Sequence, residues 1–371
     1  MKDADDFIIF SPRDVDLSHS PLRGLGEETY VLGAFNPGLT RLPNGNLLLM
    51  VRVAEALRRP VQSDGVLSIR WDGGKFGLDR FPKSDVDASD PRQFHLLGSR
   101  APTLILTSLS WCLPVELSPD GGEVVAAHYD RAIGPQASYQ EYGVEDPRIS
   151  RIEDRWYMTA CSVSAERHCT TMHISGNGLD YRLAGIVLDH QNKDMLLFEG
   201  KVGGAFAALT RPMGQCYFAY PPDSEYLSGP AILLAQSPDG LHWRPMDRPG
   251  IRPRRNSPAS AKVGGGAPPI LTERGWLVLY HGVEPNESVG AYRTFWALLD
   301  REDPTRIIRL EDREPLLEAR REISRDLDPL RYLRDIVFTT GIVDAGDHYI
   351  VASGEDDLAC RITRIPKSRF E

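Results

Sequence analysis

Hydrophobic and polar positions along the chain repeat one arrangement five times: a short turn containing Gly, Asp or Asn leads into a run of apolar residues. A turn followed by a strongly apolar run is the usual sequence signature of a β-strand. The pattern therefore predicts five similar strands. They are residues 44–52, 153–161, 203–211, 273–281 and 346–354.

A second strand is predicted after each of these runs, at residues 66–71, 171–175, 232–237, 294–300 and 358–363. Several of them lead into Asp-Gly or Asn-Gly turns, which are typical of hairpins. Five hairpins with long connections predict an all-β chain, and specifically a five-bladed β-propeller that occupies residues 1–371 as a single domain. A β-sandwich is the alternative, because strand signals alone do not fix topology. Residues 77–142 and 244–262 fit the repeat least and are expected to be long loops.

The stretch Gly143 to Ile149, with the sequence Gly-Val-Glu-Asp-Pro-Arg-Ile, concentrates two carboxylates, a proline and an arginine. Pro147 disfavours a helical conformation at Asp146, so a turn here holds the Asp146 side chain in one direction beside a cation. Such a carboxyl can serve as a general acid. The alternative is an exposed acidic turn in which Asp146 pairs with Arg148, because Asp-Pro is also a common turn dipeptide.

Charged residues stand at the ends of the predicted strands. If the first strand of each pair is innermost, these side chains converge on a central channel, and converging cations repel one another unless an anion binds between them. The alternative for each residue alone is a solvated strand end or a pair with a neighbouring turn. The residues are Arg52, Arg211 and His281, with Asp356 and Asp357 just beyond the fifth strand.

Composition narrows the partners and the compartment. The net charge of −9 and the pI near 5.6 argue against nucleic acid or an anionic membrane as a main partner. The N-terminus lacks an export pattern and no apolar run is long enough to span a membrane, so we expect a cytoplasmic protein. The five cysteines are odd in number and without Cys-x-x-Cys spacing, which predicts buried thiols and neither disulfides nor a zinc site.

Several short motifs together resemble glycoside hydrolase family 130, which contains β-mannoside phosphorylases and some β-mannosidases on a five-bladed propeller. Each motif is weak alone, but they occur in the family's order over nearly the whole chain. They are Glu145-Asp-Pro-Arg148, Lys193-Asp194, Arg211-Pro212, Gly264-Gly-Gly-Ala-Pro-Pro-Ile270, Gly275-Trp276, Tyr280-His-Gly-Val283, Ala297-Leu-Leu-Asp300 and Glu302-Asp-Pro304.

The resemblance implies an enzyme that breaks β-mannosides by inverting phosphorolysis and yields α-mannose 1-phosphate, with Asp146 as the general acid. Inversion needs room for a separate nucleophile on the opposite sugar face, and that nucleophile is inorganic phosphate in the phosphorylases. No other cofactor and no metal is expected. The alternatives are an inverting β-mannoside hydrolase and a carbohydrate-binding propeller without turnover. The sequence does not determine the acceptor sugar, the linkage or the oligomeric state. A homo-oligomer is one of the states left open.

The resemblance also implies a role for each site residue. Phosphate needs several cationic donors, preferably including the fork of an arginine. The implied phosphate-binding residues are Lys193, Arg211, Lys262 and His281. The implied substrate-binding residues, for a β-mannoside oligosaccharide or glycoconjugate, are Asn36, Arg52, Glu145, Arg148, Tyr292 and Asp357, with Trp276 as another candidate ring.

Departures from the family pattern lie near the expected site. Ser353-Gly-Glu-Asp-Asp357 differs from the family's motif, so Glu355 or Asp356 are alternatives to Asp357 as the sugar contact. The bulky pair Phe295-Trp296 is expected to reshape the acceptor side. His168, Cys169 and His173 are not expected to bind a metal, because an odd separation in a strand points side chains to opposite faces.

Overall fold

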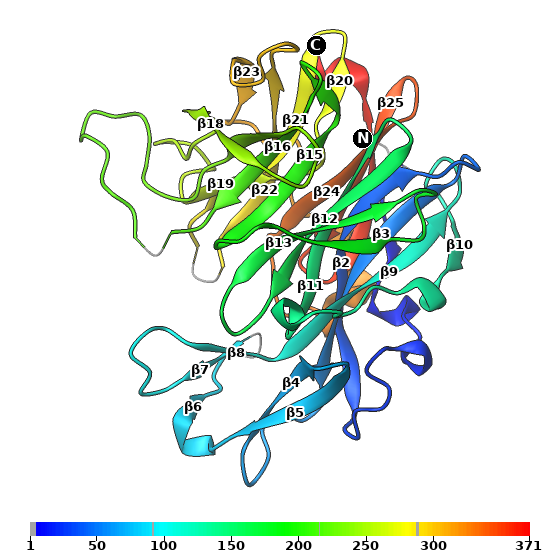
Figure 1. Ribbon diagram of the computed structural model, residues 1–371, viewed down its shortest axis with the longest axis vertical. Helices are drawn as coiled ribbons and strands as arrows, with labels where there is room; N and C mark the ends of the chain where they lie inside the picture. The colour runs from blue at the N-terminus through cyan, green and yellow to red at the C-terminus, as the bar shows by residue number, and fades with distance from the viewer. Residues whose placement is uncertain (1–4, 91–92, 215, 287–288) are drawn as a thin grey trace.

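The computed structural model describes residues 5–90, 93–214, 216–286 and 289–371, and its regular structure is almost entirely β-strand (Figure 1). This confirms the all-β prediction. The 3₁₀ segments are η2 (Pro12–Asp14), η3 (Leu17–His19), η4 (Lys83–Asp85), η5 (Tyr129–Arg131), η6 (Ser138–Gln140), η7 (Arg321–Leu330) and η8 (Lys367–Phe370). Among the described residues, no helix has the length and apolar character required to cross a membrane.

The main strands form five antiparallel units, of which the first two are joined by a single parallel pairing between Gly143 and Ser110. Unit I contains β2 (Thr29–Arg41), β3 (Leu47–Leu57), β9 (Ser108–Leu117) and β10 (Val124–Ala127). Unit II contains β11 (Gly143–Ile152), β12 (Arg155–Val163), β13 (His168–Ser175) and β14 (Arg182–Leu188). Unit III contains β15 (Asn192–Val202), β16 (Ala205–Pro212), β17 (Leu233–Ser237) and β18 (Arg244–Pro249).

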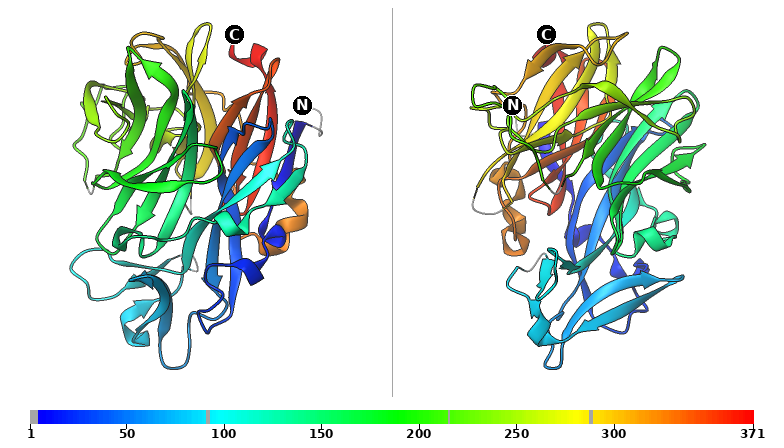
Figure 2. Two further views of the ribbon diagram at one scale, coloured as in Figure 1. Left: turned by 45° about the vertical axis from the view of Figure 1, so that its right-hand side comes forward. Right: turned by 60° about the vertical axis from the view of Figure 1, so that its left-hand side comes forward.

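Unit IV contains β19 (Lys262–Gly265) and β20 (Ile270–Thr272), which both pair with β21 (Gly275–Glu284), followed by β22 (Ala291–Leu299) and β23 (Ile307–Glu311). Unit V contains β24 (Val337–Asp344), β25 (His348–Glu355) and β26 (Ala359–Pro366), and its outer strand is β1 (Asp6–Phe10). The N-terminal strand therefore lies beside the C-terminal strands (Figure 2). Asp6 ties them together, since its carboxylate accepts hydrogen bonds from Arg361 Nε and Nη2 at 2.6 and 2.7 Å.

The five apolar runs form strands, but they are the second strand of each unit, not the first. The innermost strands are β2, β11, β15, β19 and β24, and contacts run from β24 to β2, from β2 to β11, and on through β15 to β19. The condition that residues 44–52, 153–161, 203–211, 273–281 and 346–354 lie innermost therefore does not hold. The first strands contain proline, glycine and backbone bulges, which interrupt the alternation that identifies a strand.

An insertion between β3 and β9 accounts for another difference. β4 (Val66–Asp72) pairs with β5 (Lys75–Phe81) and not with β3, and β6 (Val86–Asp87), β7 (Gln93–Leu96) and β8 (Leu104–Leu106) form a further small sheet. The insertion lies at the lower end of Figure 1, in cyan and light blue. Residues 77–142 are thus not simply a loop, and β18 falls within 244–262. Strands β5, β7 and β8 are short and mostly half-exposed, so their apolar pattern is weak.

Apolar clusters fill the space between neighbouring units, including between the fifth and the first. Because every unit buries both faces against its neighbours, the core is a series of interfaces. Examples are Val51 with Ile350 between units I and V, Met50 with Met158 between I and II, Met172 with Leu197 between II and III, Phe198 with Val278 between III and IV, and Leu279 with Val351 between IV and V. Four cysteines are buried as predicted, whereas Cys216 is exposed.

Candidate active site

Asp146 lies within a strand and not in a turn before one, since β11 already begins at Gly143. Its backbone has φ of 50°, and the pairing of β11 with β12 shifts register between Glu145 and Arg148. Asp tolerates this left-handed conformation better than most residues do. The bulge turns the Asp146 side chain out of the regular alternation of the strand.

The same device occurs in the first strands of two neighbouring units. Asn36 in β2 has φ of 47° and Asp194 in β15 has φ of 57°, and each lies at a register shift against the second strand of its unit. Because β2, β11 and β15 contact one another in turn, the three bulges face a shared region. Asn36 Nδ2 donates a hydrogen bond to Asp146 Oδ1 at 2.9 Å, which shows that two of them meet.

Arg52, from the second strand of unit I, joins the two carboxylates of the motif. Its Nη1 lies 2.8 Å from Asp146 Oδ1 and its Nη2 lies 2.9 Å from Glu145 Oε1. Burial by itself raises the pKa of Asp146, but the Arg52 and Arg148 guanidiniums outweigh it and hold that pKa below its ordinary value. Asp146 is therefore ionised in the ligand-free protein.

Arg148 does not pair with the Asp146 carboxylate, so the alternative of a simple surface pair is wrong. Its Nη1 donates to the Asp146 backbone carbonyl at 2.9 Å, and its Nη2 lies 3.0 Å from Asp194 Oδ1. The Arg148 side chain is 2% exposed and also donates to the carbonyls of Gly265 and Gly266. It lies beneath the acid, where it links three units.

Asp194 is the centre of a buried cluster that contains Arg148, Arg211 and His281. Arg211 Nε lies 2.5 Å and His281 Nε2 lies 3.6 Å from Asp194 Oδ2, and the Asp194 side chain is 1% exposed. Burial alone raises the pKa of Asp194, but Arg211 and Arg148 hold it well below its ordinary value. Gly264 makes room for this arrangement, because a Cβ there would lie 2.4 Å from the His281 ring. A larger residue at 264 would displace His281 or Asp194.

The predicted phosphate-binding residues of this region differ in their protonation states. Lys193 Nζ lies 3.4 Å from Glu145 Oε2, and although burial opposes its charge, Glu145 raises its pKa. Burial and the neighbouring Arg211 lower the pKa of Lys262 to about 8. Burial lowers the pKa of His281 to about 3, so its imidazole is neutral in the ligand-free protein and not the cation that we expected.

The three consecutive acids at the end of β25 have different surroundings. Glu355 accepts hydrogen bonds from Arg361 Nη1 at 2.9 Å and from the Arg320 backbone, and Asp356 pairs with Arg331. Asp357 instead interacts electrostatically with Arg52 and Lys262. Of the three, Asp357 is the carboxylate whose charge acts on predicted site residues.

The aromatic residues named from the sequence also differ in their surroundings. Tyr292 lies under Lys262, whose Nζ is 4.9 Å from the ring centroid, and its ring centroid is 5.7 Å from that of His281. Trp276 is 2% exposed and packs edge-on against Phe198, so it belongs to the core. Phe295 and Trp296 are also buried, which contradicts the expectation that they shape the acceptor side.

Two features were missed or undervalued at the level of sequence. Asp194 was noted only as part of a short motif, yet it binds both Arg148 and Arg211. The available signal is its resemblance to Asn36 and Asp146, because all three are an Asn or Asp at a bulge of a first strand. His168 was considered only as a metal ligand, but it pairs with Val163, which pairs with Gly143 at the start of β11. The charges of Lys193 and Glu145 also act on it. Among the described residues there is no group of three His, Cys, Asp or Glu able to hold a metal.

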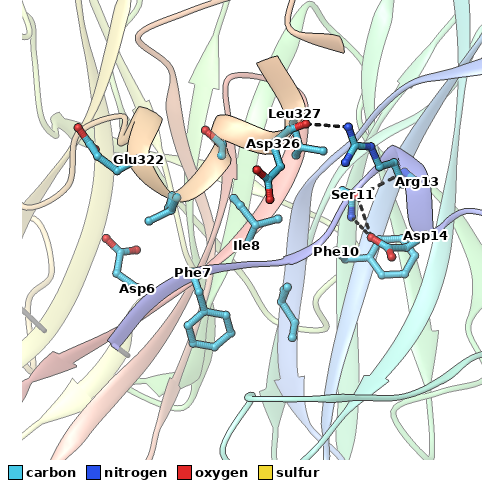
Figure 3. A pocket seen from close by; sticks show the side chains of 13 residues that line it. Asp6, Phe7, Ile8, Phe10, Ser11, Arg13, Asp14, Glu322, Asp326 and Leu327 are labelled. Atoms are coloured by element: carbon cyan, nitrogen blue, oxygen red, sulfur yellow. Dashed lines mark hydrogen bonds between the residues drawn. The ribbon is translucent and has the colours of Figure 1, made fainter. Parts of the chain in front are cut away.

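A separate cavity of about 640 Å³ lies between β1 and η7 (Figure 3). It is lined by Asp6, Phe7, Phe10, Arg13, Glu322 and Asp326, together with neighbouring residues of both segments. None of the predicted site residues lines it. Arg13 Nη2 donates to the Asp326 carbonyl across it at 2.7 Å, which fixes the two segments together.

Comparison with known proteins agrees with the geometry. Residues 109–369 match the family described as Glyco_hydro_130, beta-1,4-mannooligosaccharide phosphorylase. A beta-1,2-mannobiose phosphorylase of Listeria innocua is 32% identical, with 91% of this chain and 88% of the relative covered. A 1,2-beta-oligomannan phosphorylase of Thermoanaerobacter sp. is 31% identical over 62% of this chain and 71% of the relative.

A solved structure is similar to this protein over nearly the whole chain. The beta-1,2-mannobiose phosphorylase from Listeria innocua, in complex with beta-1,2-mannobiose, has a TM-score of 0.77 at 28% identity, with 98% of this chain and 97% of that chain covered. The family match spans well over half of the sequence, and it includes Asp146, Asp194, Arg211, Lys262 and Asp357. The chain therefore belongs to glycoside hydrolase family 130.

Proposed function

We propose that this protein is an inverting β-mannoside phosphorylase with Asp146 as its general acid and inorganic phosphate as its co-substrate. The observation that carries the proposal is the convergence of one carboxyl, held by Asn36 and Arg52, with Lys193, Arg211 and Lys262 from neighbouring units. We also infer that the five units are the blades of the predicted five-bladed propeller. The presence of an apolar interface between every pair of neighbours favours this arrangement over a two-sheet sandwich.

The chemistry needs one proton and one nucleophile. A phosphate oxygen forms a bond to C1 of the mannosyl unit as the bond from C1 to the leaving oxygen breaks, which inverts the configuration. The proton of Asp146 passes to that oxygen through a hydroxyl of the bound mannosyl unit. Because Asp146 is ionised without ligands, it must gain a proton first. Bound phosphate favours this, since its negative charge opposes a second anion nearby.

Phosphate has suitable partners on units III and IV. Lys193 and Lys262 supply charge, and Arg211 supplies a guanidinium whose orientation is fixed by its ion pair with Asp194. His281 is neutral and is assigned a hydrogen-bonding role, because a neutral imidazole still donates through one ring nitrogen. Glycoside hydrolysis needs no such set of cations, so their retention favours phosphorolysis.

The mannosyl unit is assigned to the opposite side, between units I and V. Asn36, Arg52 and Asp357 offer amide, guanidinium and carboxylate groups suited to hydroxyls. Tyr292 contributes a ring close to Lys262, and Glu145 bridges Arg52 and Lys193 through its two carboxylate oxygens. Arg148, which is buried, is assigned a positioning role beneath Asp146.

Phosphate dependence tests the proposal directly. We expect incubation with β-1,2- and β-1,4-linked manno-oligosaccharides to release mannose 1-phosphate only when phosphate is added. Mannose released at the same rate without phosphate would identify a hydrolase instead. The absence of turnover on every β-mannoside, combined with measurable sugar binding, would identify a carbohydrate-binding protein.

The pH dependence of kcat/KM for phosphate should follow the charge of Lys262. Because its pKa is lowered to about 8, Lys262 loses its positive charge as the pH rises through about 8, and phosphate affinity should fall with it. We expect kcat/KM for phosphate, which reflects the free enzyme, to decline between about pH 8 and 9. Lys262→Arg should remove this decline, since arginine stays charged. An identical alkaline limb in the variant would contradict the assignment.

A further inference from the structure

We propose that the insertion between β3 and β9 forms, with unit II, a pocket for the leaving-group sugar of the substrate, in which His168 and Gln191 bind sugar hydroxyls. The inference rests on the proposed function and adds to it a specificity site outside the acid and phosphate groups. The cavity has a volume of about 340 Å³. Its wall combines Leu104 and Leu106 of the insertion with Tyr142, Val163, His168 and Gln191.

Three chain segments connect this pocket to the active site. Tyr142 directly precedes β11, the strand that carries Asp146, and Val163 pairs with Gly143 at the start of that strand. Gln191 directly precedes β15, which begins with Asn192 and Lys193. A strand rises about 3.3 Å per residue, so Gly143 lies only about 10 Å from Asp146 along β11. The proposal places the leaving-group sugar across this distance, between Asp146 and the pocket.

Strand pairing links His168 to β11, because His168 pairs with Val163 and Val163 pairs in turn with Gly143. The charges of Lys193 and Glu145 both act on His168, and burial lowers its pKa, so its ring is neutral at neutral pH. His168 Nδ1 lies 2.6 Å from Gln191 Oε1. An amide oxygen only accepts, so Nδ1 carries the proton and Nε2 is left as an acceptor for a hydroxyl. The Gln191 amide group provides donors in the same place.

The remaining wall suits the apolar face of a sugar ring. Leu104, Leu106 and Val163 line it, and ligand pockets generally combine such surfaces with a few polar groups. A backbone hydrogen bond ties the insertion to the segment just before unit II, since Trp71 N donates to the Glu141 carbonyl at 2.8 Å. A second hydrogen bond joins two strands within the insertion, since Ser68 Oγ donates to the Leu106 carbonyl at 2.9 Å. The pocket is thus formed before any substrate arrives.

The test fills the pocket from its exposed side. Leu104 is 46% exposed, so Leu104→Trp adds a large ring without disturbing the core. In the synthesis direction, with α-mannose 1-phosphate as donor and mannose or β-1,2-mannobiose as acceptor, we expect the KM for the acceptor to rise about tenfold. The KM for α-mannose 1-phosphate and kcat at saturation should stay unchanged. Leu97→Trp is the matched control, because Leu97 is 53% exposed in the same insertion but does not line the cavity.

A second variant addresses the polar contacts. We expect His168→Ala to raise the acceptor KM severalfold, again without a change in the KM for α-mannose 1-phosphate or phosphate. His242→Ala, on an exposed turn of unit III, should behave as the parent. An unchanged acceptor KM in both pocket variants, or an equal rise in the KM for every substrate, would overturn the pocket while leaving the proposed function intact. A parent protein that forms no mannose 1-phosphate would overturn the proposed function, and the pocket with it.

Discussion

Asp146→Asn should lower kcat for phosphorolysis of β-mannosides by about 10²–10⁴-fold, the usual contribution of a general acid. Asn keeps the shape of the side chain and can still contact Asn36 and Arg52, but it has no acidic proton to give. Folding and sugar binding should therefore be retained. Turnover of a manno-oligosaccharide with phosphate, measured beside mannose binding by calorimetry, separates the two effects.

A substrate with a good leaving group gives a more decisive test of the role of Asp146. The 4-nitrophenolate ion leaves without protonation, so Asp146→Asn should lose much less activity on 4-nitrophenyl β-mannoside than on an oligosaccharide. Asp303→Asn is the matched control, because it changes an exposed Asp that also precedes a proline. Equal losses on both substrates would mean that Asp146 does not act as the acid.

Asp194→Asn should destabilise the protein by about 3–5 kcal/mol, which is the usual effect of removing one partner from a buried ion pair. The change leaves Arg148 and Arg211, with side chains 2% and 7% exposed, without their shared carboxylate. Urea denaturation of parent and variant at pH 7 measures the difference. Asp64→Asn, which breaks the exposed pair with Arg80, should have little effect by comparison.

The pH dependence of the Asp194 effect has a definite sign. The folded-state pKa of Asp194 lies well below the value of 3.8 that the unfolded chain has. Its contribution to stability is therefore fully present above about pH 4 and is lost as the pH falls toward the folded-state pKa. The difference between parent and Asp194→Asn should shrink on acidification below pH 4. A constant difference down to pH 2 would contradict the ion-pair explanation.

The two experiments also distinguish the role of Asp146 from that of Asp194. Asp146 contacts Arg52, which also binds Glu145, and replacement of Asp146 should change chemistry with little loss of stability. Asp194 lies in the buried cluster, where it orients Arg211 and Arg148, and its replacement should reduce both stability and phosphate affinity. Because Arg148 and Arg211 are buried, water does not replace the carboxylate that they lose.

Local sequence signals were sufficient for part of the fold. The second strands, such as β12 and β21, are buried and bounded by turns, so their apolar runs identify them. The first strands escaped notice because their bulges at Asn36, Asp146 and Asp194 break the alternation. The insertion was misassigned for a different reason, since pairing of β4 with β5 and of β3 with β9 depends on partners far along the chain.

The sequence by itself determined the all-β class, the turn-and-strand repeat and the Glu-Asp-Pro-Arg motif with its candidate acid, because these depend on residues close together in the chain. The tertiary structure decided that Arg52 and not Arg148 binds the Asp146 carboxylate, that Asp357 and not Glu355 or Asp356 faces the site, and that His281 is neutral. These outcomes depend on burial and on ion pairs between different units. Burial and long-range pairing set the charge and direction of a side chain, and neither can be obtained from spacing along one strand.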